Sequence, residues 1–523
     1  MHRAGCQSTC GRLFRVTEVN QASFSDSDLI CDFLIIGGGS AGCVIARRLA
    51  DRTRDRIILL EAGKSDEGDP AAIDLAQLDK QTTDYDWGFQ SSPLDGSARV
   101  MDYSRARILG GCGNHNDCAY LEPPASDFLG WEALGAKGWG PGDVQPFFAR
   151  IREFVHVDRE YERSSVSQAF VSAGKELGFP ETPFHKEILP GVGWFPLNSR
   201  GKLRHSSSVA YLHPLKRLPP HLEVRTETLA KKLLLDGTRV VGAETSRGRI
   251  FARREVVLTA GAIQTPQLLM LSGIGPQQHL RKHGIPVAVD LPGIGSHLLD
   301  HVCVSVCWEL KEPVPQWVHT PYQATLLAKI DRDAPAPDLL FHFGLRPDDA
   351  QNPGASSHAD PADCVVVQPN VARARSEGCV KLSSADPFDK PLIRLNYLSD
   401  KDGYDLRMLW EGLRLARRLG STQRMGQLIK TETAPGRDIQ SDDGLKAYIR
   451  EACKTVFHAC GTAAMGNSEN PQTVVDPRLR VKGVTGLRVC DASVFPSLVT
   501  VNINCTVMMV AEKAADMILA DRR

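Results

Sequence analysis

The sequence has no excess of charge of either sign. Its 523 residues include 62 Lys and Arg and 62 Asp and Glu, so the formal net charge is +0 at pH 7. Domains that bind nucleic acid usually carry a strong positive charge or a basic face. We therefore do not expect nucleic acid, or another polyanion, as a partner.

Long apolar runs are missing as well. No stretch approaches the roughly 18 apolar residues that a membrane helix needs, and the most apolar tract near the C-terminus covers only residues 506–511. The lead over residues 1–28 contains arginines but no apolar segment of the kind found in a secretion signal. We expect this lead to be disordered, and we expect a soluble, cytoplasmic protein with no membrane partner.

Cysteine is sparse and shows no pairing pattern. The 14 cysteines are spread along the chain, far below the density of a disulfide-stabilised domain, and none has the C-x-x-C spacing typical of zinc sites. We expect reduced thiols and no metal. Six cysteines near the motifs described below are interpreted as small buried residues rather than as redox-active pairs. They are Cys112, Cys118, Cys453, Cys460, Cys490 and Cys505.

The strongest motif is a glycine-rich turn between two apolar strands. Residues 32–36 predict a buried strand, 43–51 a helix, and 56–60 a second strand. Glycines in this turn let the backbone approach a pyrophosphate, and the acid after the second strand accepts hydrogen bonds from ribose hydroxyls. The pattern predicts a dinucleotide site and leaves NAD and FAD open. Its residues are Gly37, Gly39, Ser40, Ala41, Gly42 and Glu61.

Four separated segments resemble the glucose-methanol-choline oxidoreductase family of flavoproteins. They are the dinucleotide motif, residues 107–116, residues 261–276, and a C-terminal region made of 456–462 and 491–504. Their order and spacing match those of the family. The resemblance implies FAD as the cofactor and an α/β fold, in which a Rossmann-like FAD-binding domain is joined to a substrate domain with an antiparallel sheet.

Both domains are expected to be discontinuous. The chain length predicts roughly two or three domains, and the composition, 42% hydrophobic and 24% charged, is that of an ordinary globular protein. The resemblance implies an FAD-binding domain built from 29–160, 217–300 and 455–523. It assigns 161–216 and 301–454 to the substrate-binding domain.

The second glycine-rich loop is where we expect the flavin to be attached. The segments are most similar to choline-oxidase-like members of the family, in which a histidine at the position of His115 is bonded to the flavin 8-methyl group. Covalent FAD is therefore implied, and the alternative is a loop histidine that only forms hydrogen bonds. Asp117 departs from the small hydroxyl residue expected there. The other cofactor-binding residues implied by the resemblance are Gly110, Gly111, Asn114, Asn116, Asp491 and Ala492.

His458 and Asn502 are the predicted catalytic pair. The resemblance places both beside flavin N5, although an isolated histidine is more often a satisfied core residue. Histidine can take a hydroxyl proton near neutral pH, and a neutral amide can orient the resulting alkoxide. The implied reaction oxidises a small primary or secondary alcohol to an aldehyde or ketone by hydride transfer to N5. Dioxygen or another acceptor then takes the electrons.

The substrate pocket is expected to contain His301, His342, Cys303, Phe457, Val456 and Arg346. The two histidines lie on strands predicted over 301–310 and 339–343, and His342 is the favoured pocket residue; the alternative for both is a structural polar contact. A glutamate of choline-oxidase-like members, which faces a trimethylammonium group, is replaced by Cys303. We therefore expect choline to be disfavoured. Arg346 either binds a carboxylate or faces solvent, and an anionic substrate stays open.

Other chemistries on the same fold remain alternatives. They are a non-redox enzyme similar to hydroxynitrile lyases, a light-driven decarboxylase, and a noncatalytic flavin-binding protein. Reduction of the flavin by an alcohol in the dark separates them from alcohol oxidation. The prediction allows a homodimer and leaves open both the alcohol and the choice between oxidase and dehydrogenase.

Overall fold

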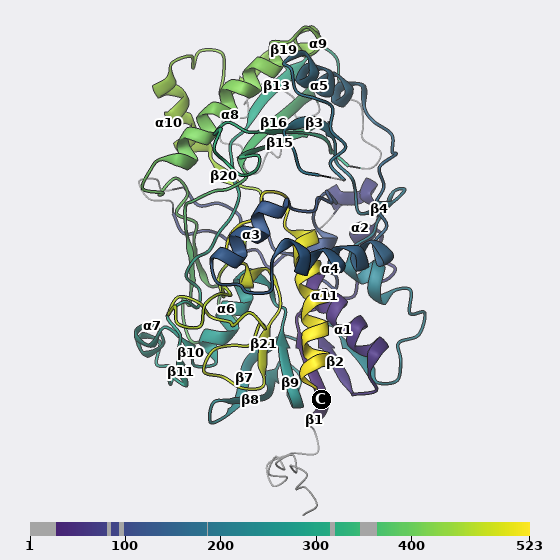
Figure 1. Ribbon diagram of the computed structural model, residues 1–523, viewed down its shortest axis with the longest axis vertical. Coiled ribbons are helices and arrows are strands. Elements are labelled where there is room, and N and C mark those ends of the chain that lie inside the picture. Colours follow the sequence, from purple (N-terminus) through teal and green to yellow (C-terminus); the bar gives the residue numbers. More distant parts are fainter. Residues whose placement is uncertain are drawn as a thin grey trace, which may run out of the picture.

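Two β-sheets lie at opposite ends of the molecule, with helices and long loops between them (Figure 1). The structure is a computed structural model that describes residues 28–80, 85–93, 99–185, 187–313, 320–345 and 363–522. Apart from its last residue, the predicted disordered lead over 1–28 therefore lies outside the described residues. Across the described ranges, no helix has the length and apolarity to cross a bilayer.

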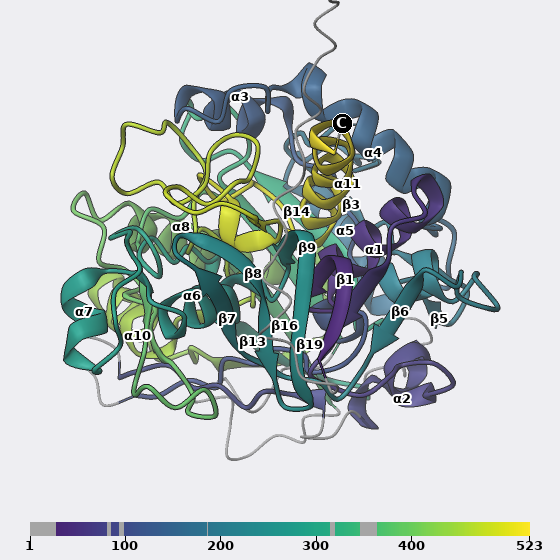
Figure 2. The same cartoon turned by 90° about the horizontal axis from the view of Figure 1, so that it is seen from below.

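The first sheet is parallel around its centre and has an antiparallel extension at one edge. Short apolar runs form its central strands, which are buried on both faces because helices cover the sheet. Figure 2 shows α1 (Ser40–Arg52) and α11 (Asn504–Asp521) beside the central strands. The strand order is β6 (Leu222–Arg225), β2 (Ile57–Leu60), β1 (Leu29–Ile36), β9 (Gly248–Leu258), β8 (Arg239–Thr245) and β7 (Ala230–Asp236), with β21 (Leu487–Val489) beside β9.

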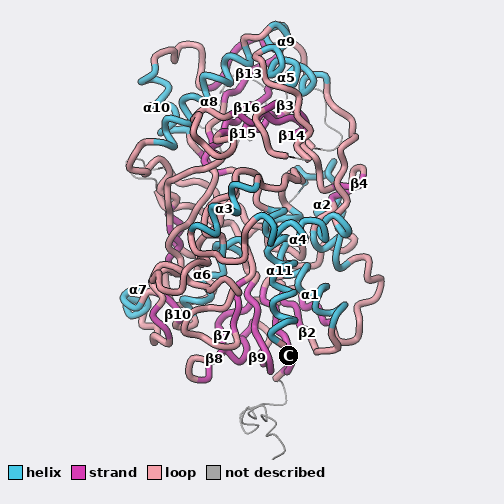
Figure 3. Tube along the Cα trace, viewed as in Figure 1, coloured by secondary structure: helices cyan, strands magenta, loops and turns pink. Residues whose placement is uncertain are grey.

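The second sheet is antiparallel throughout and lies at the other end of the molecule (Figure 3). Its inner strands are apolar, and α8 (Tyr404–Gly420) and α5 (Ser165–Glu176) pack against it. The strand order is β19 (Ile429–Ala434), β13 (Val306–Leu310), β16 (Cys364–Val371), β15 (Leu339–Gly344), β14 (Tyr322–Ala328) and β3 (Gly191–Trp194). Two short strands, β12 (Val302–Cys303) and β20 (Lys454–Thr455), extend this sheet from β16.

The prediction of a single strand over 301–310 is wrong in detail. The chain forms β12 and β13 there, with a break at 304–305. The break lies opposite Pro369 of β16, between the pairs Cys303–Asn370 and Val306–Val367, and a proline has no N–H to donate to the ladder. The pairing of β12 with β20 brings the segment before His458 to this sheet.

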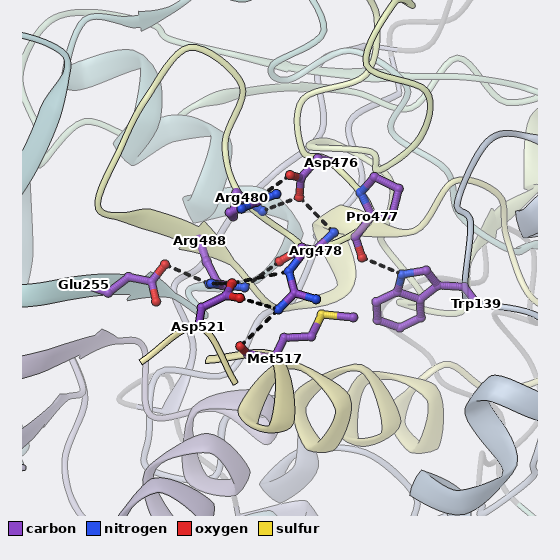
Figure 4. Close-up of polar contacts among 9 residues, drawn as sticks. All are labelled: Trp139, Glu255, Asp476, Pro477, Arg478, Arg480, Arg488, Met517 and Asp521. Carbon is purple, nitrogen blue, oxygen red and sulfur yellow. Dashed lines mark hydrogen bonds and ion pairs between the residues drawn. The ribbon is translucent and has the colours of Figure 1, made fainter. Parts of the chain in front are cut away.

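A buried arginine fastens the C-terminal helix to the first sheet. The Arg488 side chain on β21 is 2% exposed and donates to Glu255 of β9 at 2.8 Å and to Asp521 at the end of α11 at 2.5 Å (Figure 4). Arg478 donates to Asp521 as well, at 2.6 Å. Hydrogen bonds to a charged group contribute more than neutral ones. The contacts therefore hold the helix that begins two residues after Asn502.

The predicted fold class is confirmed, with a largely parallel α/β sheet at one end and an antiparallel sheet at the other. Strands of the first sheet come from 29–160, 217–300 and 455–523. Strands of the second come from 161–216 and 301–454, except that β20 ends at Thr455. The domain boundaries themselves stay a prediction.

Candidate active site

Residues of both sheets line a cavity of about 1010 Å³. Parallel strands end at the same edge of a sheet, where ligands of doubly wound folds bind. Gly37 follows β1, Glu61 follows β2, Gly261 lies shortly after β9 and Asp491 shortly after β21, and all four line the cavity. Four segments that are distant in the sequence therefore meet at this edge.

At the start of α1, the backbone faces this cavity without a side chain to cover it. A Cβ placed on Gly39 would meet no atom closer than the Cα of Gly111, at 3.7 Å, so nothing covers the turn. Gly37 has φ +110°, and a Cβ there would lie 2.4 Å from the carbonyl oxygen of Thr259. The free N–H groups at a helix N-terminus favour a phosphate. This cradle fits the pyrophosphate of a dinucleotide.

Two buried carboxylates flank the cradle. Glu61 accepts from the backbone N–H groups of Gly38 at 2.9 Å and Gly63 at 2.8 Å, and burial raises its pKa to about 7. Asp491 accepts from the N–H of Gly261 at 2.9 Å, and burial raises the pKa of its carboxyl group too. Each oxygen of Glu61 accepts one of these bonds and keeps a lone pair for a further donor. Glu61 is therefore able to hold ribose hydroxyls, and FAD fits this set of groups.

Three of the predicted cofactor residues lie behind the cavity wall. A Cβ on Gly42 would lie 1.9 Å from the carbonyl oxygen of Gly37, so glycine allows close packing of turn and helix. Asn114 donates to Asp66 at 2.7 Å, beside Gly110, and so fastens the second glycine-rich loop. The other predicted cofactor residues line the cavity: Gly37, Gly39, Ser40, Ala41, Glu61, Gly111, His115, Asn116, Asp491 and Ala492.

His115 holds its proton on Nδ1. This nitrogen lies 3.3 Å from the hydroxyl of Ser104, and that hydroxyl donates its own proton to Asp86. The Ser104 oxygen must therefore accept from Nδ1–H. Burial lowers the pKa of His115, which favours the neutral ring. Nε2 consequently carries an unshared lone pair on a residue that lines the cavity.

A chain of hydrogen bonds also defines the tautomer of His301. Its Nε2 lies 3.1 Å from the carbonyl oxygen of Ala372 and 3.0 Å from that of Val499. Since carbonyl oxygens only accept, this nitrogen carries the proton. Burial lowers the pKa of His301 and keeps the ring neutral, so its Nδ1 is an acceptor. The Nδ1 of His458, at 2.7 Å, must therefore donate to it.

His458 consequently presents a basic nitrogen to the cavity. Burial, followed by the neighbouring His301 and His342, lowers its pKa well below 6.5, so the ring is neutral. With the proton on Nδ1, Nε2 is free to accept, and the amide Nδ2 of Asn502 lies 3.3 Å from it. A hydroxyl placed between these two groups meets one acceptor and one donor. This pairing is what a general base with an oxyanion donor requires.

His342 is a second neutral histidine of the same wall. Burial lowers its pKa to about 3, and its side chain lies beside Asn502. Asn370 donates to its Nδ1 at 3.2 Å, which leaves the proton on Nε2. His342 is therefore a hydrogen-bond donor at neutral pH, not a base.

Asp300 ties the catalytic segment together, and sequence reasoning missed it. It is 4% exposed. One carboxylate oxygen accepts from the backbone N–H of His458 at 2.8 Å. The other accepts from three hydroxyls, those of Tyr103 at 2.8 Å, Tyr397 at 2.7 Å and Thr455 at 2.6 Å. Its place directly before His301 was the only signal in the sequence.

The turn that presents His458 is strained. Phe457 has φ +65°, in the left-handed region that non-glycine residues rarely adopt. Its N–H donates to the hydroxyl of Thr455 at 2.6 Å, and its carbonyl oxygen accepts from Arg105 at 3.0 Å. These contacts hold the turn, and with it the orientation of the histidine ring.

The predicted pocket residues divide into two groups. His342, Val456 and Phe457 line the cavity with His458, whereas His301 and Cys303 are buried behind the lining. Arg346 lies outside the described residues. The lining residues that sequence reasoning missed include Arg105, Tyr322, Gln368 and Lys454. Of these, only Lys454 had a signal, as a charged residue four positions before His458.

The twelve cysteines of the described residues are all free thiols. Of the six interpreted as buried, Cys112 is exposed and lines the cavity, so that interpretation is wrong for it. It lies in the short turn 111–114, whose other residues are buried, and its side chain faces the cavity.

Comparison with known proteins agrees with this geometry. Two family profiles described as GMC oxidoreductase match residues 31–303 and 374–511. The chain belongs to the GMC oxidoreductase family. It is 37% identical to a choline oxidase of Arthrobacter globiformis, over 95% of both chains, and 35% identical to an oxygen-dependent choline dehydrogenase of Brucella suis, over 93% of this chain and 95% of that one. The crystal structure of a pyridoxine 4-oxidase from Mesorbium loti superposes with a TM-score of 0.85 at 27% identity, covering 93% of this GMC oxidoreductase and 98% of that chain.

Family membership confirms two predictions made from the sequence. This GMC oxidoreductase is an FAD-dependent enzyme that acts on CH–OH donors, and FAD is its cofactor. The relatives do not support the expectation that choline is disfavoured, because two of them are named for their activity on choline.

Proposed function

We propose that this GMC oxidoreductase oxidises a small alcohol to an aldehyde or ketone, with His458 as the base. The observation that carries the proposal is the hydrogen-bond chain from Ala372 and Val499 through His301, which leaves Nε2 of His458 unprotonated. That nitrogen accepts the substrate's hydroxyl proton while Asn502 donates to the oxygen. FAD, when bound, supplies the two-electron acceptor, which dioxygen or another oxidant regenerates.

Anaerobic mixing of the FAD-loaded enzyme with alcohols in the dark tests this function. We expect bleaching of the flavin absorbance by at least one alcohol of a panel that includes choline, pentanol and γ-hydroxybutyrate, with one carbonyl product formed per flavin. A lyase, a light-driven decarboxylase or a noncatalytic flavin-binding protein would leave the absorbance unchanged in the dark. Failure of every alcohol to bleach the flavin would contradict the proposal.

We further propose that His115 bonds to the flavin 8-methyl carbon through Nε2. Support comes from its tautomer, because Nδ1–H is committed to Ser104 and the lone pair of Nε2 is free in the cavity. When this C–N bond forms, the methyl group loses one hydrogen and the imidazole loses one in the overall balance. The electron acceptor carries away the two electrons and two protons.

Acid denaturation shows whether this bond exists. We expect the yellow colour to stay with the unfolded wild-type chain and to leave the His115→Ala variant, because alanine provides no nucleophile. The matched control is His205→Ala, a histidine that does not line the cavity. Release of all flavin from the wild type would show a noncovalent cofactor.

The electron acceptor, a homodimer and a cytoplasmic location stay predictions. The relative named an oxygen-dependent choline dehydrogenase supports dioxygen as the acceptor. Choline belongs in the first substrate panel for the same reason.

A further inference from the structure

A buried lysine in the cavity wall has no hydrogen-bond partner. Lys454 is 2% exposed and lines the cavity, and no acceptor lies within hydrogen-bond distance of its Nζ. Lys454 belongs to β20 and pairs in register with Cys303 of β12. On its other side, Cys303 pairs in register with Asn370 of β16. Residues in register point to the same face of a sheet. The ammonium group therefore shares its face with a thiol and an amide, neither of which is an anion.

The carboxylates of the cavity do not compensate this charge. Those among the described lining residues are Glu61, Asp86, Asp102, Asp117 and Asp491, and none of them bonds to Lys454. Glu61 and Asp491 are held by backbone N–H groups at the edge of the first sheet. A buried ammonium group without an anionic partner is costly, because its hydration is lost and nothing replaces it. An anion that enters the cavity would remove this cost.

Lys454 also lies where its ammonium group can contact a bound substrate. It lies on the same segment as His458, separated from it by Thr455, Val456 and Phe457, which also line the cavity. A substrate whose hydroxyl meets His458 and Asn502 therefore extends along a wall that ends in a cation.

We propose that Lys454 binds a carboxylate of the substrate, so that the alcohol oxidised by this enzyme is a small hydroxy acid. This inference rests on the proposed alcohol oxidation, because the hydroxyl that is oxidised at His458 belongs to the other end of the same substrate molecule. The ammonium group gives the carboxylate a charge-assisted hydrogen bond in a site shielded from water.

Alcohols that differ mainly in charge test the proposal. We expect kcat/KM for γ-hydroxybutyrate to exceed that for pentanol. Isethionate, an alcohol with a sulfonate group, separates carboxylate recognition from attraction to any anion. We expect it to react more slowly than γ-hydroxybutyrate. Equal or lower kcat/KM for γ-hydroxybutyrate than for pentanol would overturn the proposal.

The Lys454→Met variant removes the charge and keeps much of the side-chain volume. We expect the ratio of kcat/KM for γ-hydroxybutyrate to that for pentanol to fall roughly 10- to 100-fold, the loss expected for one hydrogen bond between charged groups. Lys454→Arg should keep most of the preference, and Lys454→Gln serves if the methionine variant fails to fold. The matched control is Lys513→Met, a buried lysine outside the cavity whose ammonium group donates to the carbonyl oxygen of Gly138 at 2.6 Å. It should leave the ratio unchanged.

A binding measurement separates failure of this proposal from failure of the proposed function. Butyrate carries the carboxylate but no hydroxyl, so calorimetric titration of the FAD-loaded enzyme reports the anion site without turnover. We expect binding to the wild type and a Kd raised roughly 10- to 100-fold in Lys454→Met. An unchanged Kd, or no binding to the wild type, overturns the anion site even if alcohols are oxidised. Lys454-dependent binding without oxidation of any alcohol supports the anion site and contradicts the proposed function.

Discussion

The His458→Ala variant should oxidise alcohols about 10²- to 10⁴-fold more slowly than the wild type, the range that a positioned general base contributes. Nε2 of His458 lies 3.3 Å from the amide nitrogen of Asn502 in the cavity wall, and it carries no proton because Nδ1 donates to His301. Its loss leaves the hydroxyl proton without an acceptor. The measurement is the rate of anaerobic flavin reduction by the best alcohol of the panel.

The pH profile checks that the loss concerns a base. His458 accepts a proton only while neutral, and burial lowers its pKa well below 6.5. The acid limb of kcat/KM in the wild type should therefore lie below pH 6.5, with activity constant from there through neutral pH. A control variant, His156→Ala, changes a half-exposed histidine outside the cavity and should retain the rate and the profile. A wild-type acid limb above pH 6.5, or His458→Ala reacting at nearly the wild-type rate, would refute the assignment.

The Asp300→Ala variant should lose about 3–5 kcal/mol in free energy of unfolding, because four buried donors lose their acceptor. These are the hydroxyls of Tyr103, Tyr397 and Thr455 and the backbone N–H of His458. Water cannot replace the carboxylate easily at a site that is 4% exposed. Urea denaturation of the FAD-loaded enzyme, followed by tryptophan fluorescence, measures the loss.

Asp300→Asn distinguishes positioning from stability. The amide keeps the volume and one acceptor oxygen, so this variant should fold, yet the turn over 455–458 should be held less firmly. We expect a lower kcat with little change in KM for it. Asp51→Ala, which removes a partly exposed carboxylate paired with Arg47, should stay within about 0.5 kcal/mol of the wild type. An Asp300→Ala variant as stable as Asp51→Ala would show that the network does not hold the fold.

The cofactor end of the site was accessible to sequence reasoning because its signals are local. The turn from Gly37 to Gly42 and the acid Glu61 belong to one strand, helix and strand unit, whose short apolar runs predict their own structure. The catalytic pair required more, since His458 and Asn502 are joined only by the tertiary fold. Their assignment came from resemblance to a family rather than from periodicity, and the structure places them 3.3 Å apart.

The α/β class, the dinucleotide cradle and the family follow from the amino-acid sequence alone, because each depends on residues that are close along the chain or on motifs in a set order. Which histidine faces the cavity, and which one supports it from behind, depends instead on contacts made in the folded chain. His301 became the supporting residue because two carbonyl oxygens from separate segments take its proton. Lys454 became a cavity residue because β20 pairs with β12 of the second sheet. Strand pairing between distant segments and the sharing of protons among buried rings depend on contacts in space, and no local pattern of residues records them.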